Sequence, residues 1–405
     1  IEYLMYENVL FIFPDYFGGN FLKTIVFGYK IIFPLILFHV WKFPLHEFYK
    51  NKFLQNYSIF FLLFLVWSLV PTLISGNFIS YLKLFAIIFF FMGFIGFIHK
   101  NPEAVDLIFK LLIFYVLIAF FQYLIVVIFG YYEYMPDRDL TGPFGLLGKT
   151  QARIGFLDPP FIRMNGFWRE PSNLSGAAFA AFFISRFIYK KENKKFWLVS
   201  SLICLFSGFL ALSNAGILAL GIALAINEIF SKKKKLFFSN FRLYIISIFG
   251  ISLAVFSLYG RYYITENNLD NKYLRAIAGV RSLNDKDYDP SSGRIERYSF
   301  TIDYIKKNPI GIGVQVTGIQ NDGIGAPAGA LFYWLYLVGI PGLIFLLLRD
   351  FNLFRKILNL IKSNHINKLP ALAFIVIFIQ QSLYGSWIDP YILIFSSIIL
   401  SFKNK

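Results

Sequence analysis

Apolar residues recur in long runs along nearly the whole chain, and short polar segments separate them. A transmembrane helix needs about 20 mostly apolar residues, and eleven runs reach or approach that length. The pattern therefore predicts an all-α polytopic membrane protein of about 11–12 transmembrane helices. Residues 1–13 are apolar but contain two Glu, and we expect them to form the end of a further span or an interfacial helix. The predicted spans are 21–41, 54–73, 78–98, 108–129, 173–189, 196–212, 216–230, 241–259, 328–348, 370–386 and 389–402.

Composition agrees with this pattern. Hydrophobic residues make up 57% of the chain and charged residues only 15%, whereas soluble domains carry about 25% charged residues. The single cysteine, Cys204, lies inside an apolar run and excludes a disulfide within the chain. We therefore treat residues 1–405 as a single transmembrane domain.

Lys and Arg concentrate in one alternating set of connections between the spans. This set comprises 42–52, 190–195, 231–235, 349–368 and the C-terminal tail. Basic loops stay on the cytoplasmic side, so we expect a cytoplasmic C-terminus. The net charge of +16 is then a topology signal. A nucleic-acid partner is not expected, because the charge is spread over short loops rather than gathered in one basic domain.

Two long loops face the outer side in this topology, at 130–172 and 260–327. Loops of this length in a compact domain are usually functional. Lys outnumbers Arg in the chain by 26 to 13, yet nine Arg lie in these loops. Arg binds phosphate or carboxylate through two parallel contacts, so the bias favours an anionic ligand; the alternative is pairing with the loops' own acidic residues. The nine are Arg138, Arg153, Arg163, Arg169, Arg261, Arg275, Arg281, Arg294 and Arg297.

The first outer loop ends in RMNGFWREPSNLSG, residues 163–176. Glu170 and Pro171 suit the start of a helix, since Pro is tolerated in the first turn and an acid favours the positive end of the helix dipole. Trp168 is typical of the aromatic belt at a lipid interface. These structural roles leave Arg163 and Arg169 without an explanation, and we regard them as candidate ligand-binding residues.

The second outer loop contains SSGRIERYSFTIDYIKKNPIGIGV, residues 291–314. It predicts an amphipathic helix at about 292–307, ended by Asn308-Pro309. Helical spacing gives one face with Arg294, Arg297, Thr301 and Tyr304, and an apolar stripe with Ile295, Ile302 and Ile305. Such a helix can lie on the bilayer with its Arg pair directed to the mouth of the membrane domain. The alternative is an interfacial helix whose Arg bind lipid headgroups.

Three further features are weaker. Asp285, Asp287, Asp289 and Glu296 have the spacing of a calcium-binding EF-hand loop, but Pro290 replaces the required Gly, so a solvated acidic turn is the alternative. Lys83 lies near the outer end of its span, where it would bind a ligand or extend to the interface. The outer loops contain no His, and the chain has no Walker motif.

The paired outer loops and the segments at 163–176 and 291–314 resemble the O-antigen polymerase family, which is related to the O-antigen ligases. The resemblance includes the succession of Arg, a short helix, and Asn-Pro-hydrophobic-Gly-hydrophobic-Gly. It implies a GT-C-like glycosyltransferase in the bacterial inner membrane. Such an enzyme polymerises undecaprenyl-pyrophosphate-linked oligosaccharide repeats on the outer face, as in lipopolysaccharide biosynthesis. It needs no metal, nucleotide or other cofactor.

The resemblance and the residue chemistry together suggest site roles. The expected pyrophosphate-binding residues are Arg163, Arg169, Arg294 and Arg297, with Glu170 as base for the acceptor hydroxyl or as a partner that positions an Arg. Expected substrate contacts are Asn165, Trp168, Tyr298 and Lys83, where the two aromatic rings would stack on sugar. Membrane lipids and a chain-length regulator are expected partners. Ligases carry a His in the second outer loop, so its absence favours a polymerase over a ligase; a lipid-linked oligosaccharide flippase is a further alternative.

Overall fold

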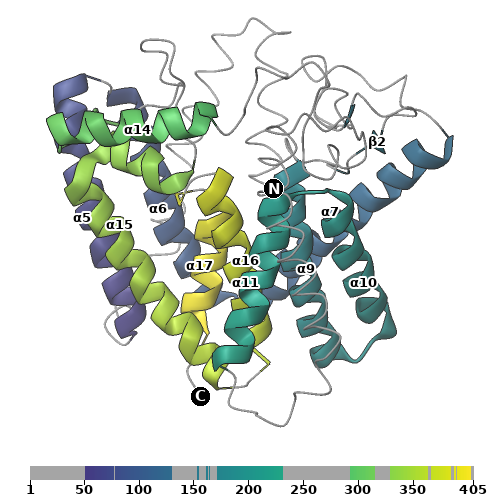
Figure 1. The fold of residues 1–405 in the computed structure, drawn as a ribbon. Helices are drawn as coiled ribbons and strands as arrows, with labels where there is room; N and C mark the ends of the chain where they lie inside the picture. The colour runs from purple at the N-terminus through teal and green to yellow at the C-terminus, as the bar shows by residue number, and fades with distance from the viewer. Residues whose placement is uncertain are drawn as a thin grey trace, which may run out of the picture. The chain divides into compact units, whose positions relative to one another are not determined.

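The structure is a computed structural model, and the part described here forms helices arranged in two compact units (Figure 1). One unit comprises 1–12, 106–289 and 361–380, and the other comprises 13–105, 290–360 and 381–405. The residues that the structure describes are 51–76, 78–129, 153–154, 161–162, 164, 171–230, 292–314, 329–363, 366–384, 387–388 and 390–402.

The observed helices coincide with nine predicted spans and with the predicted amphipathic helix. Two-residue strands β1 and β2 pair antiparallel, with Arg153 opposite Ile162. The predicted spans 21–41 and 241–259 and the N-terminal residues 1–13 lie outside the described residues. The elements are α5 (Lys52–Ser75), α6 (Phe78–Lys100), α7 (Glu103–Phe129), β1 (Arg153–Ile154), β2 (Phe161–Ile162), α9 (Pro171–Glu192), α10 (Lys195–Leu210), α11 (Asn214–Phe230), α14 (Ser292–Lys307), α15 (Ala330–Lys362), α16 (Lys368–Tyr384) and α17 (Pro390–Ser401).

The helices are long and apolar enough to confirm an all-α polytopic membrane protein. By length and composition, α5, α15 and the greater part of α6 and α7 can each cross a membrane. The shorter apolar helices α10, α11, α16 and α17 accompany them. Large apolar side chains point outward on these helices, with Val66 66% exposed, Ile74 72% and Ile128 68%. Lipid tails, unlike water, accept such surfaces without cost.

Small residues bring the helices of the first unit together. A Cβ on Gly208 of α10 would lie 2.4 Å from the Phe179 ring of α9, and a Cβ on Gly216 of α11 would lie 2.0 Å from the Ser175 hydroxyl. The Ser175 hydroxyl also donates to the carbonyl of Gly208 at 2.9 Å. Close backbone approach at small residues, with hydroxyl hydrogen bonds between helices, is the usual packing mode where no hydrophobic effect drives association.

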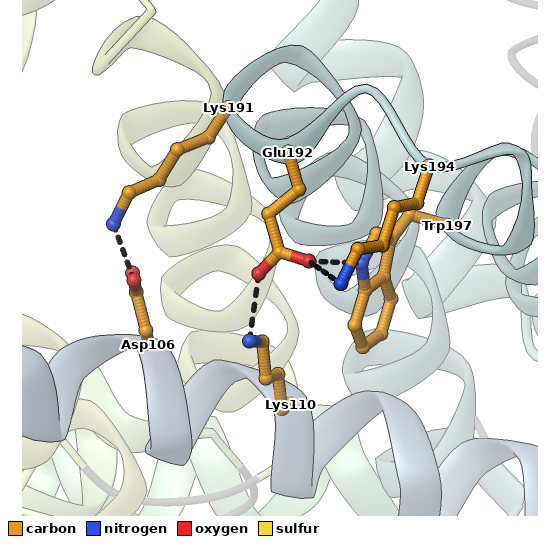
Figure 2. A network of polar contacts seen from close by, with 6 residues as sticks. All are labelled: Asp106, Lys110, Lys191, Glu192, Lys194 and Trp197. Atoms are coloured by element: carbon orange, nitrogen blue, oxygen red, sulfur yellow. Dashed lines mark hydrogen bonds and ion pairs between the residues drawn. The ribbon is translucent and has the colours of Figure 1, made fainter.

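The end of this unit that the charge pattern predicts to be cytoplasmic carries a polar network (Figure 2). Glu192, the last residue of α9, accepts from Lys110 at 2.7 Å and from the Trp197 indole at 2.9 Å. Lys191 pairs with Asp106 on α7. These contacts hold the pKa of Glu192 down at about 2, chiefly through the hydrogen bonds from Lys110 and Trp197. The network ties the ends of α7, α9 and α10 together.

Replacing Glu192 by Gln is expected to lower the stability of the folded protein at pH 7 by about 1 kcal/mol, since charge-assisted bonds to a mostly shielded carboxylate are lost. Because the folded-state pKa is depressed, this stabilisation is complete above the ordinary pKa of 4.5 and is lost as the pH falls through about 2. Thermal unfolding in detergent at several pH values measures it. Asp303→Asn is the control, because the Lys306–Asp303 pair on α14 is exposed at 71% and 64%; an equal effect of both variants would contradict the prediction.

In the second unit, α15 departs from its predicted extent. The sequence predicts a span at 328–348 followed by a cytoplasmic loop, but the helix continues to Lys362. Arg349, Asp350 and Lys356 lie inside the helix and are buried, so the first part of the predicted connection, 349–362, is helical. Hydropathy ends a span where charges begin, whereas here Tyr57 of α5, Trp387 and Phe402, which follows α17, contact the charged groups.

Candidate functional site

The residues singled out in the first outer loop lie outside the described residues: Arg163, Asn165, Trp168, Arg169 and Glu170. The structure does describe their neighbours on both sides. Met164 is fully buried, and its N–H donates to the carbonyl of Leu210 at 3.2 Å. On the other side, α9 begins at Pro171, and Ser175 in its second turn donates to the carbonyl of Gly208.

Both anchors lie on the same last turn of α10, two residues apart. The described residues on either side of the candidate stretch, Met164 and Ser175, therefore both contact the end of α10.

An amide pair fixes the start of α9. The Gln380 amide of α16 donates to the Asn173 side-chain oxygen at 2.9 Å. One turn further, a Cβ on Gly176 would lie 2.9 Å from the Gln380 side chain, so α9 and α16 approach closely here. Ser172 is buried, with 7% exposure. The sequence indicated only a helix start at Glu170 and Pro171, and it did not single out Gln380; a polar residue inside an apolar run was the available signal.

Helix α14 of the second outer loop lies across the ends of α5 and α15 (Figure 1). Thr301 is fully buried and Ile305 is 6% exposed, while Ile302 is 44% exposed. The Tyr304 ring packs against Tyr336 of α15 at 5.0 Å between centroids. Tyr304 of the predicted Arg-bearing face therefore packs on α15, and Thr301 of that face and Ile305 of the predicted apolar stripe are both buried.

The candidate residues Arg294 and Arg297 are part of α14, and their side chains lie outside the described ones. In the sequence, Arg294 precedes Thr301 by seven positions and Arg297 precedes it by four, which is the spacing of one helical face. Tyr298 is described, and its ring stacks on Phe332 of α15 at 4.3 Å between centroids and 26° between planes. The ring thus holds α14 on α15, a role that the sequence did not reveal.

Several other predictions fall where the structure gives no side-chain detail. Lys83 lies in α6, and its side chain is not described. For the calcium alternative, Asp285, Asp287 and Asp289 and the side chain of Glu296 lie outside the described part. Within that part, no three His, Cys, Asp or Glu residues form a group that would hold a metal ion.

Burial raises the pKa of Tyr304 on α14, so its hydroxyl remains a hydrogen-bond donor at neutral pH.

The segment NPIGIG, residues 308–313, has a defined structure that the sequence indicated only as a loop. It follows α14 directly and packs along α15 around Gly339, where α15 is interrupted by non-helical backbone. Helix α14, this segment and the first part of α15 therefore belong to one packed arrangement in the second unit. It presents a polar and aromatic helix at the end of an apolar helix pair, which suits a ligand with an anionic head and an apolar tail.

Comparison with known proteins agrees with this arrangement. Residues 199–347 match the family model described as O-antigen ligase. The matched range includes α10, α11, α14 and the first part of α15, and it covers less than half of the chain. It supports a place in the superfamily of O-antigen ligases and polymerases, which act in polysaccharide biosynthesis, without separating these two activities. No curated protein and no solved structure matches the chain.

Proposed function

We propose that this protein is a glycosyltransferase of the bacterial inner membrane that polymerises undecaprenyl-pyrophosphate-linked oligosaccharide repeats at the outer face. The observation that carries the proposal is the packing of α14 on α15 through Tyr298 and Tyr304. This packing lies within the range similar to O-antigen ligases, and its register is shared by Arg294 and Arg297. Two Arg at the outer end of an apolar helix pair suit a pyrophosphate joined to a polyprenyl tail.

The proposed reaction transfers the growing glycan to a new lipid-linked repeat. The acceptor hydroxyl oxygen bonds to the anomeric carbon of the growing glycan. The bond from that carbon to the pyrophosphate oxygen breaks, and the electron pair leaves with the polyprenyl pyrophosphate. Glu170 takes the hydroxyl proton; in the alternative, Glu170 positions an Arg that contacts the pyrophosphate, and the proton goes to an oxygen of the departing pyrophosphate. The leaving group is already good, so the protein must mainly stabilise negative charge and orient the acceptor.

Each candidate residue has a part in this proposal. Arg163, Arg169, Arg294 and Arg297 bind the pyrophosphate oxygens. Asn165 and Lys83 contact the substrate, and Trp168 stacks on a sugar ring. One face of the Tyr298 ring stacks on Phe332, so Tyr298 contacts sugar only through the rest of its side chain. Membrane lipids and a chain-length regulator are proposed partners, and the C-terminus is proposed to be cytoplasmic.

A ligase is the second candidate, and the description of the matched family favours it. A polymerase is preferred because none of the four His residues lies in either long outer loop. A flippase is less favoured. Broken helices in transporters expose their free backbone groups to a substrate or ion, whereas neighbouring protein groups occupy those of α15 around Gly339.

Purified protein incubated in detergent with lipid-linked repeat, and without nucleotide, is expected to produce a ladder of longer lipid-linked glycans. Gel separation of the products measures it. Transfer of the glycan to added lipid A core would identify a ligase instead. Movement of the repeat across reconstituted vesicles without a ladder would identify a flippase, and either result would overturn the polymerase assignment.

A further inference from the structure

The break in α15 leaves carbonyl groups without their usual helical donors. Gly339 has φ 66° and ψ −168°, which no helix contains. The carbonyl of Leu337 would normally accept from the N–H four residues later, but that residue is Pro341, which has none. Buried backbone groups must find partners elsewhere, and Leu337 and Val338 are both fully buried.

The NPIGIG segment and α5 supply these partners. The N–H of Ile312 donates to the carbonyl of Tyr336 at 3.1 Å, and the N–H of Gly313 donates to that of Leu337 at 2.8 Å. The Trp67 indole of α5 donates to the carbonyl of Val338 at 2.8 Å. In return, the N–H of Ile340 donates to the carbonyl of Pro309 at 2.9 Å.

Only glycine fits at the closest points of this arrangement. Gly311, Gly313 and Gly339 all have positive φ. A Cβ on Gly311 would lie 2.5 Å from the backbone nitrogen of Gly339, and a Cβ on Gly339 would lie 2.2 Å from the carbonyl oxygen of Pro309. A Cβ on Gly313 would lie 2.8 Å from the carbonyl oxygen of Pro71 in α5. These neighbours are backbone atoms, which cannot rotate away as a side chain does.

The same arrangement continues into α14 without a flexible joint. The N–H of Asn308 donates to the carbonyl of Tyr304, so the segment begins on the last turn of α14. The aromatic contacts of Tyr298 with Phe332 and of Tyr304 with Tyr336 bind α14 to the part of α15 before the break. Helix α14 is therefore held on α15 from Tyr298 to its C-terminal end.

We propose that residues 308–313 and 336–340 form a backbone latch that positions α14, and with it Arg294 and Arg297, for the transfer reaction. Trp67, Gly311 and Gly339 are then positioning residues that act without touching the substrate. The effect of the latch on turnover rests on the proposed function. The existence of the latch does not depend on which reaction the protein catalyses. The chemical need is clear, because a charge-stabilising Arg displaced by about 1 Å can cost about 10²-fold in rate.

Trp67→Phe is the first test, because it removes the indole hydrogen bond to Val338 and keeps an aromatic side chain at this position. Hydrogen–deuterium exchange of the purified full-length protein is expected to accelerate by about tenfold in the peptide that covers 308–314. The turnover number for polymer formation is expected to fall by about 10- to 100-fold, with the KM for lipid-linked donor nearly unchanged. Gly339→Ala is a separate and stronger variant, because its new Cβ would clash with the carbonyl oxygen of Pro309.

Two control variants separate the latch from general damage. Trp197→Phe also removes one indole hydrogen bond, to Glu192, outside the latch. Gly76→Ala introduces a side chain at φ 72°, but no atom lies within 4 Å of the new Cβ. Neither control is expected to change exchange in 308–314 or turnover.

The outcomes are distinguishable. Unchanged exchange in 308–314 for both Trp67→Phe and Gly339→Ala would overturn the latch. Faster exchange with normal turnover would overturn its positioning role. Absence of polymer from the wild-type protein would refute the proposed function, while the exchange data would still decide whether the latch exists.

Discussion

Replacing Arg294 or Arg169 by Ala is expected to reduce polymer formation by about 10²- to 10³-fold, the usual effect of removing one preorganised charge-stabilising group. Each Arg is proposed to hold pyrophosphate oxygens that gain negative charge as the glycosidic carbon departs. The interaction strengthens in the transition state, so the turnover number should fall more than the donor affinity. Gel analysis of lipid-linked products against time measures the rate.

Substitution by Lys gives a further test of this role. Lys keeps the charge but has no planar fork for two-point phosphate contact, so Arg294→Lys should recover only part of the rate. Arg355→Ala is the matched control, since Arg355 is an exposed Arg of α15 in the segment after the apolar run. Polymer of unchanged rate and length distribution from Arg169→Ala and Arg294→Ala membranes would show that these residues do not bind the pyrophosphate.

The second large effect concerns a buried ion pair inside α15. Arg349 is fully buried, and its Nε donates to the Asp350 carboxylate at 2.8 Å. Its Nη2 donates to the carbonyl of Trp387 at 3.1 Å, and its guanidinium carbon lies 4.8 Å from the Phe61 ring centre. Burying either charge alone in an apolar environment would be strongly unfavourable, and pairing the two charges offsets much of that free-energy cost.

Asp350→Leu is expected to destabilise the protein by about 3–5 kcal/mol, because it leaves the Arg349 charge buried without its counter-ion. The double variant Arg349→Leu/Asp350→Leu should recover most of that loss, since two apolar side chains need no compensation. Arg349 Nη1 and Asp350 Oδ2 find no hydrogen-bond partner among the described residues, so the pair is incompletely satisfied and easier to replace as a unit.

Chemical unfolding in detergent micelles measures both variants, and the double-mutant cycle gives the coupling between the two residues. Arg355→Leu on the same helix is the control and should change stability by less than about 0.5 kcal/mol, as exposed substitutions do. A double variant as unstable as Asp350→Leu would show that the residues do not act as a compensating pair.

The helices were largely predictable because a bilayer imposes a length and an apolar composition that are written into local sequence. The predicted spans 54–73 and 173–189 lie within the observed α5 and α9. Helix α15 continues beyond the predicted span 328–348, where Arg349 and Asp350 suggested the end of a span. A hydropathy window scores each charged residue alone. The free energy of burying a charged side chain depends, however, on a counter-ion and on aromatic rings from distant parts of the chain.

The candidate site was also predictable only in part from the sequence. The sequence alone indicated the Arg-rich outer loops, the amphipathic helix of the second one and an anionic ligand. The resemblance to O-antigen polymerases added the reaction, and the family match at 199–347 supports the broader superfamily. The site roles of Arg163, Arg169, Glu170, Arg294 and Arg297 stay predictions.

By itself, the sequence determined that the chain crosses a membrane many times and where its helices lie, because apolar run length and charge placement are local properties. Only the tertiary structure decided what NPIGIG does, since the carbonyl groups that it satisfies lie in α15 and become unpaired only through Gly339 and Pro341. It also decided that Tyr298 holds α14 against Phe332 and that Asn173 meets Gln380. These contacts join residues that are far apart in the chain, and periodicity within one helix contains no information about the partner.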